Sequence, residues 1–311
     1  MKPAIAILGS LNMDFVVSVA RLPAPGETVL GSGFQMIPGG KGANQACAAG
    51  KLASGVLAVR MAGRVGYDVF GDHLKASLAA AGVDVSFVHA TRSEPTGVAL
   101  ISVEAGGQNS IVVAGGANHA VTAGEIESLR EFYRGAVAAL FQLETPLDAV
   151  AAALRIAREE GATTILDPAP AQPLPATLLA HVDVLTPNES EAAILLGRAP
   201  SRLTAEEAPA VARCLQALGP RRIVLKLGDQ GCYYQEDGNG FHVAPYAVSC
   251  VDSTAAGDTF NGALAVALAD QQPVPDALRF ACAAAAISVT RRGAQASIPT
   301  RAEVDAFQRT A

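Results

Sequence analysis

Residues 252–262 read Asp-Ser-Thr-Ala-Ala-Gly-Asp-Thr-Phe-Asn-Gly, and an apolar helical pattern follows them. The small residues Ala255, Ala256 and Gly257 let backbone N–H groups approach a ligand closely. A helix that begins there points its unpaired N–H groups and its positive dipole end at the same place, which predicts an anion site. Asp258 beside that site makes sense if its carboxylate accepts a proton from a hydroxyl while the N–H groups hold phosphate charge. The alternative is that Asp258 is an ordinary helix N-cap.

A second polar cluster lies within the first 45 residues. An apolar strand, Ala4–Leu8, leads into a segment in which extended backbone would place Asn12 and Asp14 on the same side. The run Pro38-Gly39-Gly40-Lys41-Gly42-Ala43-Asn44-Gln45 then opens a small-residue helix, with Lys41 and Asn44 on one face. Such amides, acids and a lysine suit a polyol, although each residue alone is also typical of a solvated loop. The run is not a Walker A loop, because a glycine follows the lysine where Ser or Thr is required.

These stretches resemble the two signatures of the PfkB carbohydrate kinases, and most closely those of the ribokinase branch of that family. Other stretches agree in order and spacing, and the resemblance runs from about Ile5 to Arg301. They are Gln142-Leu143-Glu144, Asp167-Pro168-Ala169-Pro170-Ala171, Thr186-Pro187-Asn188-Glu189 and Val289-Thr290-Arg291-Arg292-Gly293-Ala294-Gln295.

Composition is typical of a globular protein with no nucleic-acid partner. The chain has 311 residues, half of them apolar and 17% charged, which is enough for one large core or two modest ones. A net charge of −6 offers no basic patch. The five cysteines are scattered without metal spacing, which favours reduced thiols and a cytoplasmic location. We expect no signal peptide and no membrane span.

The chain alternates between strand and helix patterns, which predicts an α/β fold with a mostly parallel sheet covered on both faces. The resemblance implies a ribokinase-like three-layer α/β/α fold, and we expect a single domain over residues 1–311. The expected strands are Ala4–Leu8, Leu57–Met61, Val137–Leu143, Thr164–Asp167, Val182–Leu185 and Ile223–Leu227. The expected helices are Gly42–Ala53, Asp68–Ala81, Pro146–Glu160, Glu189–Leu196, Ala205–Leu218, Gly257–Leu268 and Asp276–Thr290.

Four further strands break this alternation. Phe15–Val19 and Val29–Phe34 flank a Pro/Gly turn, and Val98–Val103 and Ser110–Ala114 flank Gly106-Gly107. They predict a small separate sheet formed by about residues 12–38 and 95–115. The resemblance implies that this sheet is a lid over a sugar and that two lids pair in a homodimer. A small lone sheet has an exposed apolar face and open edges, and docking relieves both.

The resemblance assigns roles to the residues at the proposed reaction centre. Asp258 would be the general base, and the N–H groups of Ala255, Ala256 and Gly257 would hold the transferring phosphate. Glu144, at the end of a strand, would accept a sugar hydroxyl hydrogen, although it could instead be an acid at a helix N-terminus. The full set of expected sugar-binding residues is Asn12, Met13, Asp14, Gly40, Lys41, Gly42, Ala43, Asn44, Glu144 and Asp258.

For ATP, the run Lys226-Leu227-Gly228-Asp229-Gln230-Gly231 follows a strand and by resemblance contacts the nucleotide, together with Asn188 and Gly257. Glu191 lies one helical turn beyond Asn188, and the pair matches the family's Asn-x-x-Glu motif for Mg²⁺-bound phosphate. Magnesium keeps most of its waters, so few protein ligands are expected. Cys282 stands where some relatives place a histidine near the adenine.

The resemblance also implies a monovalent cation, potassium, beside the anion site. Several of its oxygen ligands would be backbone carbonyls. By position the ligands would come from Asp252, Thr254, Ser288, Arg291, Gly293 and Ser297.

Together these features predict ATP-dependent phosphorylation of D-ribose at its 5-hydroxyl. A kinase for another sugar or a nucleoside is the near alternative. A catalytically silent sugar-binding protein is the distant alternative, and the intact Asp258 and Gly257 argue against it.

Overall fold

The computed structural model describes residues 2–104, 106 and 108–310. Within them a central nine-stranded sheet has the order β13-β12-β11-β10-β9-β8-β1-β4-β5. Neighbouring strands are parallel from β11 to β5, and β12 and β13 continue the sheet as antiparallel strands. The strands are β1 (Ala4–Leu8), β4 (Ala58–Gly66), β5 (Val83–Thr91), β8 (Ala136–Phe141), β9 (Thr163–Leu166), β10 (Val184–Leu185), β11 (Arg222–Lys226), β12 (Cys232–Glu236) and β13 (Asn239–Val243).

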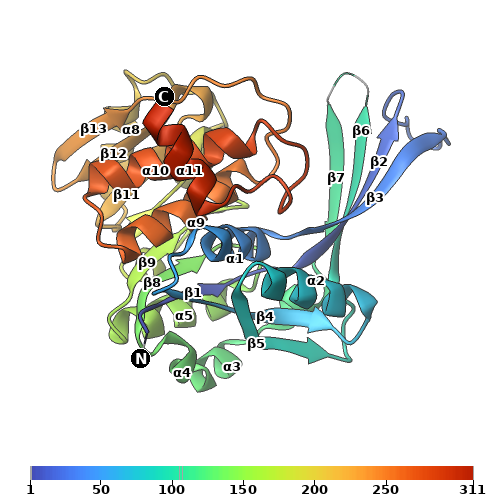
Figure 1. The fold of residues 1–311 in the computed structure, drawn as a ribbon, viewed down its shortest axis with the longest axis horizontal. Coiled ribbons are helices and arrows are strands. Elements are labelled where there is room, and N and C mark those ends of the chain that lie inside the picture. The colour runs from blue at the N-terminus through green and yellow to red at the C-terminus, as the bar shows by residue number, and fades with distance from the viewer. Residues whose placement is uncertain (1, 105, 107, 311) are drawn as a thin grey trace.

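Helices cover both faces of this sheet and bury an apolar cluster on each. One face carries α1 (Lys41–Leu52), α2 (Val69–Ala80), α9 (Ala256–Ala269), α10 (Val274–Ser288) and α11 (Arg301–Thr310). The other carries α3 (Ala123–Ser128), α4 (Arg130–Tyr133), α5 (Leu147–Glu159), α6 (Ala176–Leu179), α7 (Glu189–Leu195) and α8 (Ala208–Gln216). Figure 1 shows α1, α9 and α10 in front of the strands. The expected three-layer α/β/α fold is therefore confirmed.

Small residues let α1 and α9 pack tightly against each other on the first face. A Cβ added to Gly262 of α9 would lie 2.6 Å from the Cβ of Ala48 and 2.8 Å from the carbonyl oxygen of Gln45. The two helices therefore approach at backbone distance. Each helix begins inside one of the two signature stretches, α1 at Lys41 and α9 at Ala256, so this packing brings the two signatures together.

The four strands outside the alternation form a second sheet, as expected, with the order β3-β2-β6-β7. We call it the small sheet. It consists of β2 (Asn12–Val19), β3 (Gly31–Gly39), β6 (Gly97–Glu104) and β7 (Asn109–Ala114), and it projects from one end of the body (Figure 1). Strands β2 and β6 pair in parallel, so the sheet is mixed. The expected turn at Gly106-Gly107 falls partly on Gly107, which lies outside the described residues.

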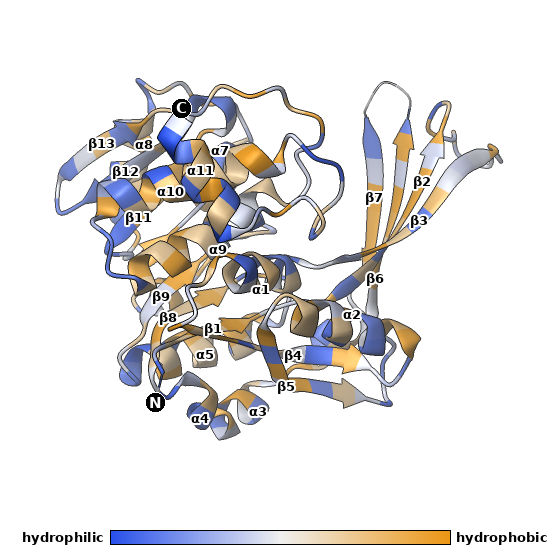
Figure 2. Ribbon diagram, in the orientation of Figure 1, coloured by the Kyte–Doolittle hydropathy of each residue, from blue (hydrophilic) through white to orange (hydrophobic). Residues whose placement is uncertain are grey.

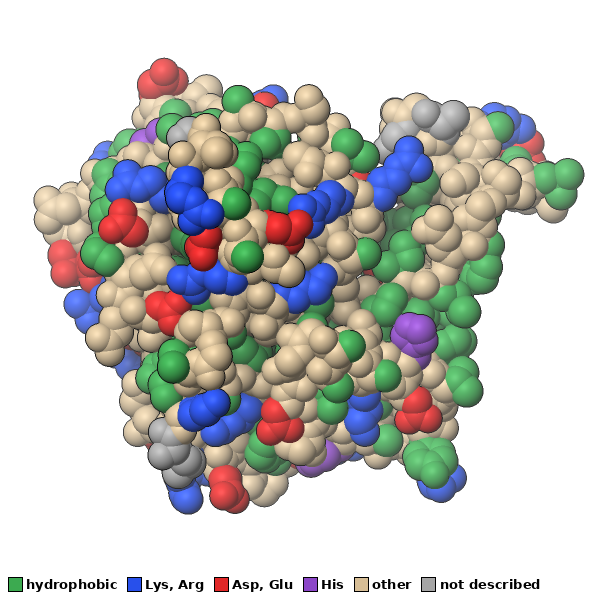
Figure 3. All heavy atoms as spheres, viewed as in Figure 1, with side chains coloured by type: hydrophobic (Ala, Val, Ile, Leu, Met, Phe, Trp, Pro, Cys, Tyr) green, Lys and Arg blue, Asp and Glu red, His purple; other side chains and the backbone are tan. Residues whose placement is uncertain are grey.

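The small sheet touches the body at its base and exposes apolar side chains further out. Phe15 of β2 meets Phe70 of α2 edge to face, with ring centroids 5.4 Å apart. Figures 2 and 3 show hydrophobic residues gathered along its strands. Those more than half exposed are Phe34, Met36, Leu100, Ile111, Val112 and Val113. Met36, Leu100 and Val112 share one face of the sheet, because strand pairing aligns them through Phe15, while Ile111 and Val113 point to the other face. In a monomer both sets of side chains lie open to water, which is unusual.

The main differences from the expected elements lie at the edges of the central sheet. Strands β5, β12 and β13 and helix α11 were not expected. The expected helix 205–218 starts three residues late because Thr204 and Glu207 form a turn before it. The expected strand 182–185 pairs only at Val184 and Leu185. None of the helices in the described part of the chain has the length and apolar character to cross a membrane.

Candidate active site

Asp258 lies in the first turn of α9 and is only 7% exposed. It is the third residue of the helix, and Ala255 occupies the N-cap position, so the N-cap interpretation of Asp258 is wrong. The Asp258 carboxylate accepts hydrogen bonds from two neighbouring amides of α1. Asn44 Nδ2 donates to Oδ2 over 3.0 Å, and Gln45 Nε2 donates to Oδ1 over 3.1 Å. The carboxylate is thus held in one orientation at the junction of the two signatures.

A buried chain of polar side chains continues from Gln45 across the sheet. Gln45 Nε2 also donates to Asp167 Oδ2 over 2.9 Å, and Asp167 Oδ1 accepts from Lys226 Nζ over 2.8 Å. Gln142 Nε2 donates to Gln45 Oε1 over 2.7 Å, which fixes the orientation of the Gln45 amide. Asp167 follows β9 and Lys226 ends β11, two parallel strands separated by β10, so both lie at the carboxyl edge of the sheet, where open α/β folds bind ligands. Of these four residues, only Lys226 was expected in the site.

The expected sugar-binding acids converge on the N-terminus of α1. Glu144 Oε2 accepts from Ser10 Oγ over 2.5 Å and from the backbone N–H of Lys41 over 3.1 Å. Glu144 therefore lies against α1, and the alternative in which it is an acid at the start of α5 is not observed. Burial, together with the nearby carboxylates of Glu144 and Asp258, raises the pKa of Asp14 to about 7. The three acids therefore share one electrostatic site.

Lys41 is the cation at the centre of these acids. Burial alone would lower its pKa, but the carboxylates of Asp258, Asp167, Glu144 and Glu191 outweigh burial and raise it. The pKa of Asp258 is raised to about 6, because burial and the neighbouring Asp167 carboxylate outweigh the opposing effects of Lys41 and the two amide donors. A carboxyl group with a pKa near neutrality can both accept and return a proton at physiological pH.

Other residues expected to bind the sugar are also closely packed within the protein. Met13 and Ala43 are buried in the apolar core. The Gly42 N–H donates to Ser10 Oγ over 3.3 Å. Gly40 has φ +88°, and a Cβ there would lie 2.7 Å from the backbone nitrogen of Asn12. These residues hold the start of α1 against the segment that carries Asn12 and Asp14.

The anion loop has a strained backbone that sequence reasoning did not predict. Ala255 adopts the left-handed conformation, with φ +59°. An alanine there costs about 1–2 kcal/mol relative to a right-handed residue, a strain found mainly at functional sites. The Ala256 N–H donates to the Ser253 carbonyl over 3.2 Å and so helps to close the loop. A Cβ on Gly257 would have Lys226 Nζ as its nearest neighbour, at 3.5 Å. An ammonium group therefore lies beside the loop that was expected to hold phosphate.

Asn188 and Glu191 form a reciprocal capping box at the start of α7. Glu191 N–H donates to Asn188 Oδ1 over 2.8 Å, and Asn188 N–H donates to Glu191 Oε2 over 2.7 Å. The pair also lies beside Lys226, because Asn188 bridges to Lys226 as a strand residue. Burial raises the pKa of Glu191, and Lys226 opposes that effect. The Asn-x-x-Glu pair is thus held rigidly at the edge of the charged cluster.

In the rest of the expected nucleotide-binding run, the side chains are mostly engaged within the protein, which leaves mainly the backbone to contact a ligand. Leu227 is buried in the core, Asp229 pairs with Arg202, and Gln230 donates to the Leu203 carbonyl over 2.9 Å. Gly228 and Gly231 both have positive φ and make the turn. Cys282 lies on α10, with its sulfur 3.8 Å from that of Cys232.

Asp252 joins the two segments that were expected to hold a monovalent cation. Its carboxylate accepts from the backbone N–H of Gly293 over 2.9 Å and from the hydroxyl of Thr254 over 2.6 Å. Both the Val251 and Asp252 N–H groups donate to the Val289 carbonyl. Ser288 and Ser297 are fully buried at the ends of the same region. The six expected residues thus lie in two adjacent segments that offer hydroxyl, carboxylate and carbonyl oxygens, which suit a hard cation. Among the described residues, no group of three or more His, Cys, Asp or Glu side chains could hold a metal ion.

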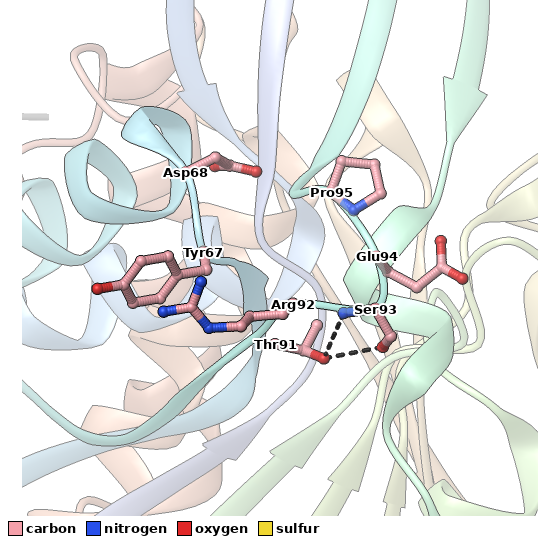
Figure 4. A pocket seen from close by; sticks show the side chains of 7 residues that line it. All are labelled: Tyr67, Asp68, Thr91, Arg92, Ser93, Glu94 and Pro95. Atoms are coloured by element: carbon pink, nitrogen blue, oxygen red, sulfur yellow. Dashed lines mark hydrogen bonds between the residues drawn. The ribbon is translucent and has the colours of Figure 1, made fainter.

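A hollow of about 270 Å³ lies outside this cluster, at the base of the small sheet (Figure 4). Tyr67, Asp68 and residues 91–95 line it, and the guanidinium of Arg92 lies 4.1 Å from the centre of the Tyr67 ring. Asp68 already accepts hydrogen bonds from Gly71, where it caps α2, and from Thr96. The Asp68 carboxylate therefore has a structural role.

Known proteins match this chain over nearly its whole length. Residues 2–301 match the family described as pfkB family carbohydrate kinase. The chain is 40% identical to the ribokinase of Haemophilus influenzae over 309 residues, which cover 99% of each chain. It is 42% identical to the ribokinase of Schizosaccharomyces pombe over 306 residues, covering 97% of this chain and 96% of the relative. The structure of Arabidopsis thaliana ribokinase complexed with ribose and ATP superposes with a TM-score of 0.90 at 35% identity, and the match covers 99% of each chain. This chain belongs to the pfkB family of carbohydrate kinases.

Proposed function

We propose that this protein transfers the γ-phosphoryl group of ATP to the 5-hydroxyl of D-ribose, giving ribose 5-phosphate and ADP. The observation that carries the proposal is the buried Asp258 carboxylate, which two amides orient at the start of α9 beside Lys41 and the anion loop. Curated relatives of nearly the same length are ribokinases, and this supports ribose as the acceptor.

In the proposed reaction the hydroxyl oxygen attacks the γ-phosphorus as its proton passes to Asp258. A new O–P bond forms, and the bond between the γ-phosphorus and the β,γ-bridging oxygen breaks. Asn12, Asp14, Lys41, Asn44 and Glu144 would bind the sugar. The N–H groups of Ala255 and Gly257 and the ammonium of Lys226 would stabilise charge on the transferring group, which is the main requirement of phosphoryl transfer. The Ala256 N–H would have to leave the Ser253 carbonyl to join them.

We also assign Mg²⁺ and potassium as required ions. Asn188 and Glu191 would receive Mg²⁺-bound phosphate through water, since Mg²⁺ rarely gives up its whole hydration shell. Potassium would bind oxygen atoms of residues 252–254 and 288–297 and stiffen the anion loop through the Asp252 connection. Because this effect acts on the loop that holds the phosphate, potassium should raise turnover with Mg²⁺ already saturating.

The small sheet would act as the sugar lid of a single domain, residues 1–311. Its exposed apolar side chains favour a homodimer in which two small sheets cover each other. Light scattering should give twice the chain mass at micromolar concentration, and a monomer at every accessible concentration would refute the dimer.

Five free thiols in the described chain agree with the proposed cytoplasmic location.

The decisive experiment is a sugar screen with purified protein, Mg-ATP and potassium. Sugar-dependent ADP release should be largest with D-ribose in a panel of pentoses, 2-deoxyribose, hexoses and nucleosides. Preference for another acceptor would keep the kinase and replace the substrate. No release with any acceptor would refute the kinase assignment and leave a silent sugar-binding protein.

Asp258→Asn tests the base assignment directly. The variant should bind sugar and ATP but lose at least about 100-fold in kcat, the lower range for loss of a general base. A variant within a few-fold of the wild-type rate would refute the role of Asp258.

Replacing potassium by sodium or by a bulky organic cation at matched ionic strength should lower kcat, and equal rates in all three would refute the cation site.

A further inference from the structure

Asn118 is a buried amide that joins the two ends of the small sheet. It lies in the short 3-10 helix η1 (Gly116–Ala120), just after β7, and is 1% exposed. Its Oδ1 accepts from the Leu11 N–H over 2.9 Å, and its Nδ2 donates to the Leu11 carbonyl over 3.2 Å. Nδ2 also donates to Asn12 Oδ1 over 2.7 Å. Leu11 and Asn12 lead into β2, so one side chain connects the entry to the small sheet with its exit.

The start of β6, where the chain re-enters the small sheet, lies against the same two amides. A Cβ on Gly97, the first residue of β6, would lie 2.2 Å from Asn12 Oδ1 and 2.4 Å from Asn118 Nδ2. No side chain fits there, so β6 passes in backbone contact with both amides. The residue before it, Thr96, is tied separately to the body. Its N–H and hydroxyl donate to the Asp68 carboxylate over 2.8 and 2.7 Å. Figure 4 shows Asp68 across the hollow from Pro95.

The chemistry of these contacts fixes the orientation of both amides. The Leu11 N–H can only donate, so it must face the Asn118 oxygen. The Asn118 nitrogen therefore faces Asn12, and Asn12 must turn its oxygen towards Asn118. The Asn12 Nδ2 group is then directed away from Asn118, and it has no hydrogen-bond partner among the residues that the structure describes. Asn12 thus presents a donor to whatever lies beside it.

We propose that Asn118 is a positioning residue of the sugar site: it fixes Asn12 as a hydrogen-bond donor and so selects for an acceptor oxygen on the sugar. This inference rests on the proposed sugar kinase function. Asn118 does not touch the substrate, and its effect on sugar binding passes through Asn12. If Asn118 only stabilised the small sheet, its replacement would change the sugar KM equally whichever side chain stood at position 12.

A double-mutant cycle separates these two roles, because residues that act through one another are not additive. The variants are Asn118→Ala, Asn12→Ala and the double variant, each assayed for the KM of the sugar, the KM of ATP and kcat. Asn118→Ala should raise the KM for the sugar about 10-fold, the size of a lost hydrogen bond to a buried group, and leave the KM for ATP within about 2-fold. In the Asn12→Ala background the same substitution should change the sugar KM by less than about 3-fold. Equal effects in both backgrounds would overturn the proposal.

Thr96→Val is the matched control at the same junction. It removes the hydroxyl that accepts from the Gly66 N–H and donates to Asp68, and it leaves both amides in place. It should lower the melting temperature while changing the sugar KM by less than about 3-fold, and its effect should add to that of Asn12→Ala. If Thr96→Val raises the sugar KM as much as Asn118→Ala does, Asn118 is only a brace.

Asn118→Asp serves if the alanine variant does not fold. It keeps the acceptor for the Leu11 N–H but replaces both donors by an oxygen, so Asn12 must turn its NH₂ group towards position 118. The sugar KM should rise about 10-fold here too, and an unchanged sugar KM would overturn the proposal. Failure of the proposed function is distinguishable, because the wild-type protein would then release no ADP with any sugar.

Discussion

Removal of the Gln45 amide should move the pH dependence of the reaction by a predictable amount. Gln45 is fully buried and donates to both Asp258 and Asp167. In Gln45→Leu the Asp258 carboxylate loses one of its two amide donors, which favour the charged form. A hydrogen bond to a charged group is worth about 1.5–3 kcal/mol, which corresponds to about one to two pH units.

The direction of the change follows from the sign of this effect. The pKa of Asp258 is about 6, so its ionised form predominates at pH 7. Without the Gln45 donor the pKa of Asp258 should rise, and the acid limb of kcat/KM for the sugar should move to about pH 7–8. Activity should be lost most at pH 6–7 and recover towards pH 9. A substitution that only damaged the fold would lower the rate at every pH.

The assay is kcat/KM for the sugar between pH 5.5 and 9.5 at saturating Mg-ATP, because this ratio reports ionisations of the enzyme–Mg-ATP complex before the sugar binds. Asp14, with a pKa of about 7, contributes to the same limb, so two ionisations are fitted and one should move. Gln235→Leu is the matched control. Gln235 is equally buried, on β12, and neither of its side-chain polar atoms has a partner in the described residues. An unmoved limb in Gln45→Leu, or an equal shift in Gln235→Leu, would refute the reasoning.

Three further substitutions test other parts of the site. The folded state holds the Asp14 proton more tightly than the unfolded chain does, so the free energy of unfolding should fall as pH rises from 3.8 to about 7. Asp14→Asn should therefore stabilise the ligand-free protein at pH 8 by about 1 kcal/mol or more. Equal melting temperatures of the variant and the wild type at pH 8 would contradict this. Ala255→Gly should relieve left-handed strain and leave stability within about 1 kcal/mol of wild type while lowering kcat several-fold, so a loss of more than 1 kcal/mol in chemical denaturation would count against it. Gly257→Ala should fold normally and lose turnover, whereas Gly42→Ala should fail to fold; normal turnover of Gly257→Ala would show that its Cβ meets no substrate.

The repeating core of the fold was predictable because its signals are local. Strand β1 is a continuous apolar run, and α1, α2 and α5 show helical patterns within one or two residues of their observed bounds. Strands β12 and β13 were missed although an Asp237-Gly238 turn, a common hairpin signal, separates them. Strand β5 was missed because it lies at the sheet edge, where only Val83 and Val88 of its nine residues are buried and the apolar pattern is weak.

The residues that orient the site could not be predicted from local sequence. Gln45 contacts Asp258 across 213 positions, and Asn118 contacts Asn12 across 106. A buried amide has no periodic signature, and its role appears only when its partners are known. The resemblance supplied Asp14, Glu144 and Asp258, which the structure brings together, but not Gln45, Asp167 or Asn118, which hold other residues in place.

The two glycine-rich signatures need glycine for different physical reasons. In the first, the protein itself fills the space: a Cβ on Gly39 would lie 2.2 Å from Asp14 Oδ2, and one on Gly42 would lie 2.6 Å from the Cα of Gly9. Real Cβ atoms do not approach this closely, so alanine at position 39 would displace the Asp14 carboxylate, and alanine at position 42 would push α1 away from the backbone at Gly9. In the second signature a Cβ on Gly257 meets only the ammonium of Lys226, at 3.5 Å, an ordinary contact. The space above Gly257 is therefore available to a ligand, and a phosphate that accepts from the loop N–H groups would occupy it. Glycine in the first signature preserves the geometry of the residues proposed to bind the sugar. In the second signature Gly262 serves the packing of α9 on α1, and Gly257 leaves room for the group proposed to be transferred.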